Sequence, residues 1–350
     1  MSSESAAKVT SIFVYPVKSC RGISVSHAAL SPYGFRWDRN WLVVNERGRG
    51  YTQRVEPRLA LVEVEMPTEA FDEGWEPTKD SFIVLKAPGM QPLKISLCKE
   101  HEVADGVSLW DWSGSAWHEG PEAAKWFSDY LGKTSALIRF DIESQARLAD
   151  PEYYHNKQKV LFTDGYQYLI ASQGSLDVVN QHASEPIPIN RFRANIFVEG
   201  CEPFDEDLWT KIKIGKHSFQ SVRLCYRCKI PQVNQDTGEV GEEPAQTLRK
   251  IRSGKLLRPQ GTHAQRVYFG QFLTWIQEDH SGNVIKLGDP IYVFDKSVGM
   301  KWAKYVVAFG ALKGMTTVLL VGALGQARYT THIARSHMIP PWFALVHPNT

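Results

Sequence analysis

The chain has 350 residues, 43% of them hydrophobic and 22% charged, which predicts about two ordinary domains built around hydrophobic cores. This composition excludes collagen-like and intrinsically disordered chains. The 40 basic and 38 acidic residues give a net charge of only +2, so nucleic acid is not an expected partner. Five scattered cysteines and an N-terminus without an apolar signal segment indicate a reducing compartment rather than a disulfide framework.

Charge is distributed unevenly along the chain. Residues 296–350 contain six basic and no acidic side chains, which leaves 34 of the 40 basic residues against all 38 acidic ones. We therefore treat 296–350 as a separate basic, apolar C-terminal extension. Its segment 305–324 is long enough to cross a bilayer core of about 30 Å as a helix, but Lys313 near the middle would cost about 3 kcal/mol on insertion. A membrane contact, a helix packed on the protein and a poorly ordered extension all stay open.

The first third of the sequence has the pattern of β-structure. Short alternating or β-branched runs are separated by turn signals such as Ser-Pro-Tyr-Gly at 31–34 and Arg-Gly-Arg-Gly at 47–50. Many short strands at close spacing are typical of a barrel or a sandwich. The predicted strands are 9–15, 41–45, 59–66, 82–85 and 93–97.

The middle of the chain predicts two helices among further strands. Pro121 suits the first position of a helix over 121–131 that Gly132 can end, and Ser175 suits the N-cap of a helix that reaches His182. Strands are predicted at 195–198, 218–224 and 291–294. The predicted fold class is mainly β with some α (α+β), with a β-rich domain over 8–120 and a β-dominated second domain over 121–295.

Cys225 and Cys228 form the sharpest local motif, Cys-Tyr-Arg-Cys. A structural zinc site needs four ligands, and the histidines with suitable spacing, His332 and His337, lie in the 296–350 extension. A thioredoxin-like pair should begin a helix, whereas Pro231 and the turn after it predict a loop between strands. A single thiolate metal ligand with a lowered pKa is the third interpretation, beside that of a buried cysteine with solvated neighbours. The basic neighbours are Arg223, Arg227 and Lys229.

Nine sequence blocks, taken in order, resemble MOSC-domain proteins. Those at 12–22, 38–44 and 53–59 resemble the N-terminal β-barrel domain that precedes MOSC domains. Those at 162–166, 172–176, 190–196, 225–228, 236–238 and 269–271 resemble the MOSC domain itself. The resemblance runs from about residue 9 to 294 and is strongest to the mitochondrial amidoxime-reducing component family, molybdenum enzymes that reduce N-hydroxylated compounds.

The resemblance implies a molybdenum-molybdopterin cofactor (Moco) between the β-barrel domain and the MOSC domain. The second cysteine of the pair is the family's protein ligand to molybdenum, which implies that Cys228 is the metal ligand and catalytic residue and that Cys225 does not bind metal. The residues implied to bind the cofactor are Lys18, Ser19, Arg39, Asp164, Gly165, Tyr166, Arg193 and Asn195. Arginine and lysine suit phosphate oxygens, although each residue alone has an ordinary alternative, such as an ion pair between Arg193 and Glu199.

The resemblance also implies partners and a location. Electrons would come from a cytochrome b5-type donor and its NADH-dependent reductase, because the sequence has no Gly-x-Gly-x-x-Gly motif of its own. We expect a local basic surface at Arg47, Arg49 and Arg54 to receive an acidic cytochrome. The alternative function is that of a molybdenum cofactor sulfur carrier or cofactor-handling protein. Relatives imply the mitochondrial outer membrane, whereas the N-terminal sequence leaves the cytoplasm as the alternative.

Two departures from the family pattern affect loops. Ala194 stands where proline is common, and Asn234-Gln235 stands where Asp-Pro is common, so both loops lose a stiffening residue. Tyr226 fills the variable position between the two cysteines. We expect Tyr226 to narrow the pocket and to shift substrate preference.

Overall fold

The computed structural model describes residues 5–98, 102–145, 147–149, 158–257, 263–277 and 281–297. Met1–Lys296 forms one compact unit. The predicted membrane contact at 305–324 and the histidines His332 and His337 lie outside the described residues. Within the described ranges, no helix is both long enough and apolar enough to span a membrane.

The described residues are mainly β with four α-helices, which confirms the predicted fold class. The strands of the first half are β1 (Ala7–Val14), β2 (Ile23–Val25), β3 (His27–Ser31), β4 (Gly34–Phe35), β5 (Trp41–Asn45), β6 (Glu63–Glu65), β7 (Phe82–Lys86), β8 (Leu93–Ser96), β9 (Glu102–Leu109), β10 (Trp112–His118) and β11 (Ser135–Phe140). Those of the second half are β12 (Arg147–Leu148), β13 (Lys159–Val160), β14 (Tyr168–Ser172), β15 (Ile196–Glu199), β16 (Trp209–Ile214), β17 (His217–Tyr226), β18 (Tyr268–Trp275), β19 (Val284–Lys286) and β20 (Pro290–Lys296). The α-helices are α1 (Pro121–Leu131), α2 (Gln173–His182), α3 (Ala245–Ile251) and α4 (Gly254–Leu257).

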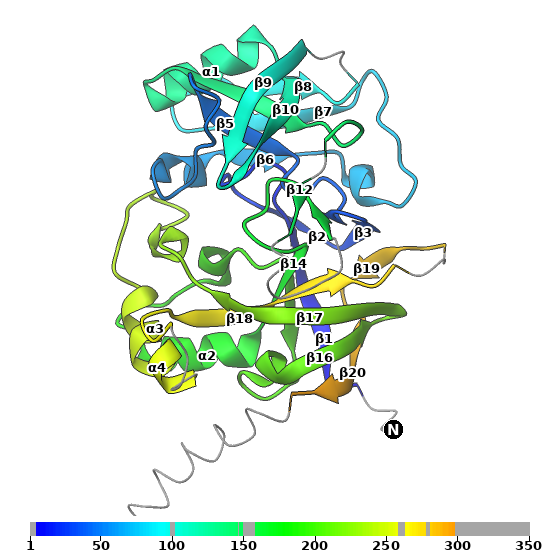
Figure 1. The fold of residues 1–350 in the computed structure, drawn as a ribbon, viewed down its shortest axis with the longest axis vertical. Coiled ribbons are helices and arrows are strands. Elements are labelled where there is room, and N and C mark those ends of the chain that lie inside the picture. Colours follow the sequence, from blue (N-terminus) through cyan, green and yellow to red (C-terminus); the bar gives the residue numbers. More distant parts are fainter. Residues whose placement is uncertain are drawn as a thin grey trace, which may run out of the picture. The chain divides into compact units, whose positions relative to one another are not determined.

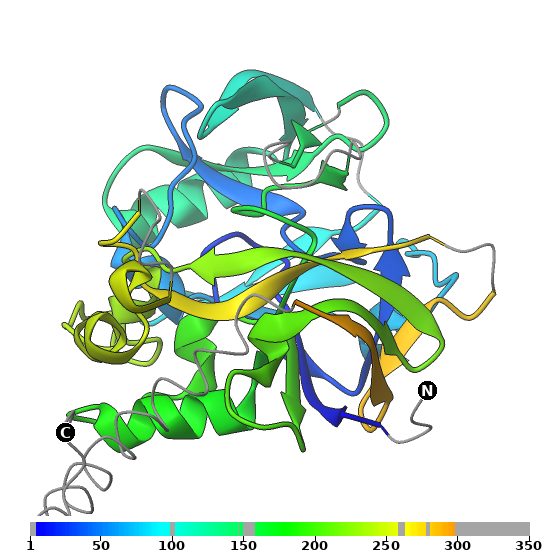
Figure 2. The same ribbon diagram turned by 60° about the horizontal axis from the view of Figure 1, so that its bottom comes forward.

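Seven strands close into a barrel in the order β15-β14-β18-β17-β16-β20-β1, because β1 pairs with both β20 and β15. Only the pairing of β14 with β15 is parallel among these neighbours. Figure 2 shows β17 and β18 running side by side across this barrel. Its interior is filled by apolar side chains such as Ile12, Trp209 and Phe219, which are almost fully buried. The first strand of the chain therefore completes a barrel whose other strands come from the second half.

Strands β5 to β11 and α1 form a second layered body. Figure 1 shows α1 and strands β5 to β10 at the opposite end of the described unit from β16 and β20. A four-stranded sheet, β5-β11-β10-β9, and a three-stranded sheet, β6-β7-β8, pack with α1 around a separate core that includes Trp41 and Phe127. Because α1 and β11 belong to this body, the point along the chain where the two domains divide stays a prediction.

The loop after β1 connects the two cores. Val14 is buried in the barrel core, whereas Val17 and Cys20 are buried in the core beneath α1. The backbone N–H of Lys18 donates to the carbonyl oxygen of Trp41 at 2.8 Å, which attaches the loop to the start of β5. Lys18 and Ser19 consequently lie where the two bodies meet.

Local sequence signals predicted both ends of α1 correctly, but they predicted only part of α2. Pro121 occupies the first turn of α1, and Gly132 ends it in the left-handed conformation with φ 70°, as predicted. The predicted N-cap of α2 is wrong by three residues. Ser172 is the cap, because its Oγ accepts the N–H of Ser175 at 3.2 Å while the hydroxyl of Ser175 is bonded elsewhere.

One predicted strand is also partly wrong. Residues Pro57–Leu61 form a 3-10 helix instead of the start of a strand over 59–66, and only Glu63–Glu65 is extended. Pro57, with its fixed φ, occupies the first turn of this helix and favours the helical start.

Glu206 anchors the start of α2 from inside the protein. Its fully buried carboxyl accepts hydrogen bonds from Ser175 Oγ at 2.6 Å, Ser172 Oγ at 3.0 Å and Ser172 N at 3.2 Å. Burial and the neighbouring charge of Asp207 raise the pKa of Glu206 to about 7. The hydrogen bonds from Ser175 and Ser172 lower this pKa and so oppose part of the shift.

We expect Glu206 to make stability depend on pH. The native carboxyl keeps a proton between about pH 4.5 and about pH 7 that the unfolded chain has lost, so the free energy of unfolding falls as pH rises through this window, by at most about 1.4 kcal/mol per unit. Glu206→Gln should flatten this slope in urea denaturation series between about pH 5 and about pH 8. The control Asp177→Asn, on an exposed side chain of α2, should keep the slope. An unchanged slope in Glu206→Gln would contradict the assignment.

Candidate active site between the two bodies

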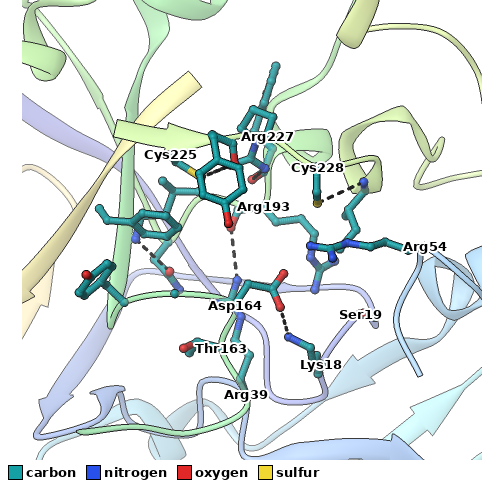
Figure 3. Close-up of a pocket in the computed structure, with 18 of the residues that line it drawn as sticks. Lys18, Ser19, Arg39, Arg54, Thr163, Asp164, Arg193, Cys225, Arg227 and Cys228 are labelled. Carbon is teal, nitrogen blue, oxygen red and sulfur yellow. Dashed lines mark hydrogen bonds and ion pairs between the residues drawn. The ribbon is translucent and has the colours of Figure 1, made fainter. Parts of the chain in front are cut away.

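One pocket gathers all nine residues that the sequence predicted for the site (Figure 3). Lys18, Ser19 and Arg39 come from the first 40 residues of the chain, and the other six lie between positions 164 and 228. The open space of the pocket, including solvent at its mouth, is about 860 Å³. Folding thus brings together residues that are up to about two hundred positions apart in the sequence.

Lys18 and Asp164 form an ion pair across the pocket. Lys18 Nζ donates to Asp164 Oδ1 and, at 2.7 Å, to the carbonyl oxygen of Phe162. Burial lowers the pKa of Lys18 to about 8, although Asp164 opposes this shift. Burial alone would raise the pKa of Asp164. The charge and hydrogen bond of Lys18, together with the charge of Arg54, instead hold this pKa below its usual value. At neutral pH both groups are charged.

Tyr15 brings two arginines together. The guanidinium carbons of Arg39 and Arg193 each lie 4.3 Å from the centroid of the Tyr15 ring, and the Tyr15 hydroxyl donates to the carbonyl oxygen of Ala194 at 3.2 Å. Burial lowers the pKa of Arg193 to about 10, which leaves the group charged. Ring faces attract guanidinium groups, so Tyr15 offsets part of the repulsion between the two cations. The predicted alternative partner of Arg193, Glu199, pairs with Lys8 at 2.9 Å instead.

Asn195 has a structural use for each of its polar side-chain atoms. Its Nδ2 donates to the carbonyl oxygen of Phe13 at 3.1 Å and to Asp38 Oδ1 at 3.2 Å, and its Oδ1 accepts the N–H of Leu169 at 3.3 Å. Asp38 also pairs with Arg39 and accepts the N–H of Tyr15 at 2.8 Å. Asn195 therefore joins the end of β1 to β14 and orients Arg39 through Asp38.

Backbone strain is concentrated around the pocket. Among the described residues, six other than glycine have a left-handed φ, and four of them line the pocket or contact a residue that does. These four are Ser19, Arg39, Trp110 and Arg193. Such a conformation costs about 1–3 kcal/mol in a side-chain-bearing residue and persists only where surrounding contacts impose it. The surrounding fold holds these side chains against their local preference.

The segment 161–166 forms the floor beside Asp164. The buried guanidinium of Arg147 donates to the carbonyl oxygens of Leu161 at 2.6 Å and Thr163 at 2.7 Å. Gly165 allows the close approach of Phe272, because an added Cβ would lie 3.1 Å from its ring. Tyr166 packs its ring 5.7 Å from that of Phe272.

The two cysteines differ in their surroundings. Cys225 is the buried penultimate residue of β17. Its Sγ accepts a hydrogen bond from the guanidinium of Arg227 at 3.0 Å, and burial raises the pKa of its thiol. Cys228 is partly exposed in the loop that follows, and its Sγ accepts the N–H of Ile230 at 3.5 Å. The loop confirms the prediction that the motif does not begin a redox helix. Cys228 is therefore the sulfur more accessible to a ligand.

Two buried amides, which the sequence did not single out, connect the cysteine loop to the first half. Gln53 Nε2 donates to Gln235 Oε1 at 3.1 Å, and Gln235 Nε2 donates to Gln53 Oε1 at 3.0 Å. Gln53 also donates to the carbonyl oxygen of Ser19 at 2.6 Å, while Gln235 Oε1 lies 3.5 Å from the guanidinium of Arg193. This amide pair fastens the loop that carries Gln235 to the first half of the chain.

Trp110 and Arg54 also belong to the site surroundings. Trp110, at the tip of the β9–β10 hairpin, donates from Nε1 to Asp164 Oδ1 at 3.3 Å. The guanidinium of Arg54 lies 4.3 Å from the centroid of the Trp110 ring and lines the pocket, although the sequence assigned Arg54 only to partner docking. No spacing in the sequence connects these residues, because the hairpin reaches Asp164 only in the folded protein.

The donor set of the pocket suits an anionic cofactor with a soft metal. Six basic side chains and one carboxylate line it, so it has a surplus of positive charge. Thr163 Oγ1 and Arg227 Nε are buried without a hydrogen-bond partner among the described residues. No cluster of three or more histidine, cysteine or acidic side chains suited to a metal occurs within the described ranges, whereas a thiolate at Cys228 can serve as a single protein ligand.

Comparison with known proteins identifies the fold family. Residues 6–134 match the model of the MOSC N-terminal beta barrel domain, and residues 157–292 match that of the MOSC domain. The chain is 32% identical over 299 residues to mitochondrial amidoxime reducing component 2 of Rattus norvegicus, covering 81% of this chain and 82% of that protein. The chain belongs to the MOSC-domain family that includes the amidoxime-reducing components. The pocket therefore lies between the segments matched by the two family models.

Two further relatives of this chain differ in the functions that their names state. Mitochondrial amidoxime-reducing component 1 of Mus musculus is 30% identical over 295 residues, covering 81% of this chain and 82% of that protein. Molybdenum cofactor sulfurase of Bos taurus is 28% identical over 273 residues, covering 71% of this chain and 29% of that protein. Homologues of this MOSC chain thus include both molybdenum-dependent enzymes and cofactor-handling proteins.

We expect Gln53 and Gln235 to be energetically coupled. Gln53→Ala leaves the buried amide of Gln235 short of partners and should lower the free energy of unfolding by about 1–3 kcal/mol. In a double-mutant cycle with Gln235→Ala, measured by urea unfolding, the coupling energy should reach about 1 kcal/mol. Gln173→Ala, which removes an exposed amide bonded to Asp177, should change stability little. Strict additivity of the two single effects would contradict the coupling.

Proposed function

We propose that this chain is a molybdenum-cofactor-dependent reductase of N-hydroxylated compounds that takes electrons from a cytochrome b5-type donor. The observation that carries the proposal is the position of Cys228. Its partly exposed sulfur lines the same pocket as the eight residues expected to bind the cofactor, while Cys225 is buried against Arg227. An accessible thiolate beside a surplus of cationic groups is what a metal carried by an anionic organic cofactor requires.

In this proposal, each group of residues has its own role. Cys228 supplies the protein ligand to molybdenum. Lys18, Arg39 and Arg193 bind the cofactor phosphate, because guanidinium groups fork onto phosphate oxygens and a buried ammonium acts as a point charge. Asp164 keeps Lys18 charged and positioned. Asn195 acts through Asp38, which it holds beside Arg39.

The reaction converts R–N–OH, two electrons and two protons into R–N–H and water. When bound, the cofactor would supply the two-electron redox chemistry of this reaction. The pocket residues would orient the N–OH group toward the Cys228 side of the pocket. Lys18 Nζ retains its proton at neutral pH, since its pKa is about 8, and shares it with Asp164.

A basic surface near the pocket mouth suits an acidic electron donor. Arg47 and Arg49 are exposed in the turn after β5. The N–H of Gly50 donates to the carbonyl oxygen of Ser108 at 2.9 Å, which fastens this turn to the hairpin that carries Trp110. The charges of Arg47, Arg49 and Arg54 are therefore available on the same side of the first body. Opposite charge at a rim mainly raises association rates.

The family leaves one alternative function. The match to the molybdenum cofactor sulfurase of Bos taurus favours a role in which Cys228 carries sulfur or passes on cofactor without turnover. Molybdenum bound in stoichiometric amount, without reduction of any N-hydroxylated substrate, would favour that role over a reductase.

We extend the proposal to location because relatives are named as mitochondrial. The chain is expected at the mitochondrial outer membrane, with residues 305–324 as the membrane contact. Fractionation of cells that express the tagged full chain, with and without residues 298–350, tests this. Purely cytoplasmic recovery of the full chain would exclude the mitochondrial location.

The two cysteines should respond differently to replacement. Cys228→Ser should abolish benzamidoxime reduction, by about a hundredfold or more, and lower molybdenum content, because it removes the metal ligand. Cys225→Ser keeps a buried donor and acceptor beside Arg227 and should retain most of the bound molybdenum. Metal analysis and single-turnover activity on purified proteins measure both effects. Full activity in Cys228→Ser would exclude the proposed mechanism.

Charge reversal at the basic surface should weaken donor docking only. Arg47→Glu combined with Arg49→Glu should raise the KM for cytochrome b5 by about tenfold at low salt and leave turnover with an artificial reductant unchanged. Arg249→Glu combined with Lys250→Glu, at two exposed positions of α3, is the matched control and should leave both activities unchanged. An equal loss with both reductants would place the defect in folding or in the pocket.

A further inference from the structure

Two exposed aromatic rings lie at the pocket, and each contacts guanidinium groups. Tyr226 is 38% exposed, with the guanidinium carbons of Arg223 and Arg266 at 4.8 Å and 4.4 Å from its ring centroid. Trp110 is 46% exposed, with that of Arg54 at 4.3 Å. We call these three arginines the arginine rim. Its members come from three separate segments of the chain.

The arginine rim has the chemistry of a carboxylate receptor. When a guanidinium group stacks on an aromatic ring, its flat face contacts the ring and its N–H donors point outward in the guanidinium plane. These donors can then bind the two oxygens of a carboxylate. Arg54 and Arg266 make no ion pair with a carboxylate among the described residues. The one carboxylate that lines the pocket, Asp164, is paired with Lys18. An anion is therefore the group that Arg54 and Arg266 lack among the described residues.

Tyr226 connects the rim to the expected reaction centre. It lies between Cys225 and Cys228 in the sequence and lines the same pocket as Cys228. A substrate group bound beside Tyr226 therefore lies close to Cys228 in the pocket and to the guanidinium groups of Arg223 and Arg266. Figure 3 shows Arg54 facing the space in front of Cys228 from the opposite body.

We propose that the arginine rim selects substrates by charge, so that aromatic N-hydroxylated compounds with a carboxylate are preferred over neutral or cationic ones of equal size. The inference rests on the proposed function and names the substrate class of that site. Lys18, Arg39 and Arg193 serve the cofactor, whereas Arg54, Arg223 and Arg266 contact the aromatic rings at the mouth. One favourable charge contact at a partly exposed rim is expected to be worth about tenfold in kcat/KM.

The test compares three para-substituted benzamidoximes on molybdenum-loaded full-length protein with an artificial reductant, so that donor docking does not contribute. The substituents are carboxylate, carboxamide and aminomethyl. We expect kcat/KM for the carboxylate to exceed that for its neutral isostere, the carboxamide, by about tenfold and the aminomethyl compound to be poorest. High salt should reduce the preference, because it screens the rim.

Replacement of Arg266 tests whether the arginine rim causes the preference for the carboxylate substrate. Arg266 does not line the cofactor pocket, so its replacement leaves the cofactor contacts in place. Arg266→Gln should lower the carboxylate-to-carboxamide ratio by about threefold through KM, and Arg266→Lys should restore part of it. Arg249→Gln, which removes an exposed arginine of α3, should leave the ratio unchanged. A ratio that survives Arg266→Gln would overturn the assignment to the rim.

A binding measurement separates this inference from the proposed function. Calorimetry with the non-reducible 4-carboxybenzamidine and 4-carbamoylbenzamidine should give the tighter Kd for the carboxylate. If all three benzamidoximes turn over without a preference for the carboxylate, the charge-selection inference is wrong and the proposed function stands. If the molybdenum-containing protein turns over none of them, the proposed function is wrong. Equal Kd values for the two benzamidines would in that case also overturn the role of the arginine rim.

Discussion

The pairing of β1 with both β15 and β20 is the constraint on which the site depends. A strand from the first residues of the chain closes a barrel made otherwise of the second half, and this closure is fixed by antiparallel ladders on both sides. Tyr15, Lys18 and Ser19 follow that strand directly, so they enter the space between the two bodies at a defined position. The rest of the pocket assembles around them, since Arg193 reaches the Tyr15 ring and Asp164 reaches Lys18.

The pocket holds positive charge in an environment that opposes it. Burial lowers the pKa of Lys18 and of Arg193, which means that the protein loses solvation energy by placing these groups inside. One carboxylate, one tyrosine ring and a few carbonyl oxygens compensate only in part. Binding of an anion would stabilise these buried cations further. Occupancy of the site is therefore expected to raise the stability of the folded protein.

The contrast between the two cysteines shows how backbone placement assigns different chemistry to identical side chains. Cys225 is still within β17 and is buried against Arg227, so its sulfur has a structural partner. Cys228 lies three residues later, past the end of the strand, where the 3-10 helix at Ile230–Gln232 directs an N–H toward its sulfur. The loop is fastened to the first body through the amides of Gln235 and Gln53, so the position of Cys228 depends on contacts with both halves.

The sequence by itself determined the mainly β fold class, helix α1 with both of its ends, the family, and the nine residues that meet in the pocket. These features depend on local signals, such as Pro121 and Gly132, or on blocks of residues whose order is distinctive. Only the tertiary structure decided that Gln53 pairs with Gln235, that Trp110 bonds Asp164 and stacks on Arg54, and that Ser172 rather than Ser175 caps α2. The physical reason is that each of these depends on a partner brought close by folding: Gln53 and Gln235 are 182 positions apart, and the cap of α2 is chosen by buried Glu206, which binds the hydroxyl of Ser175.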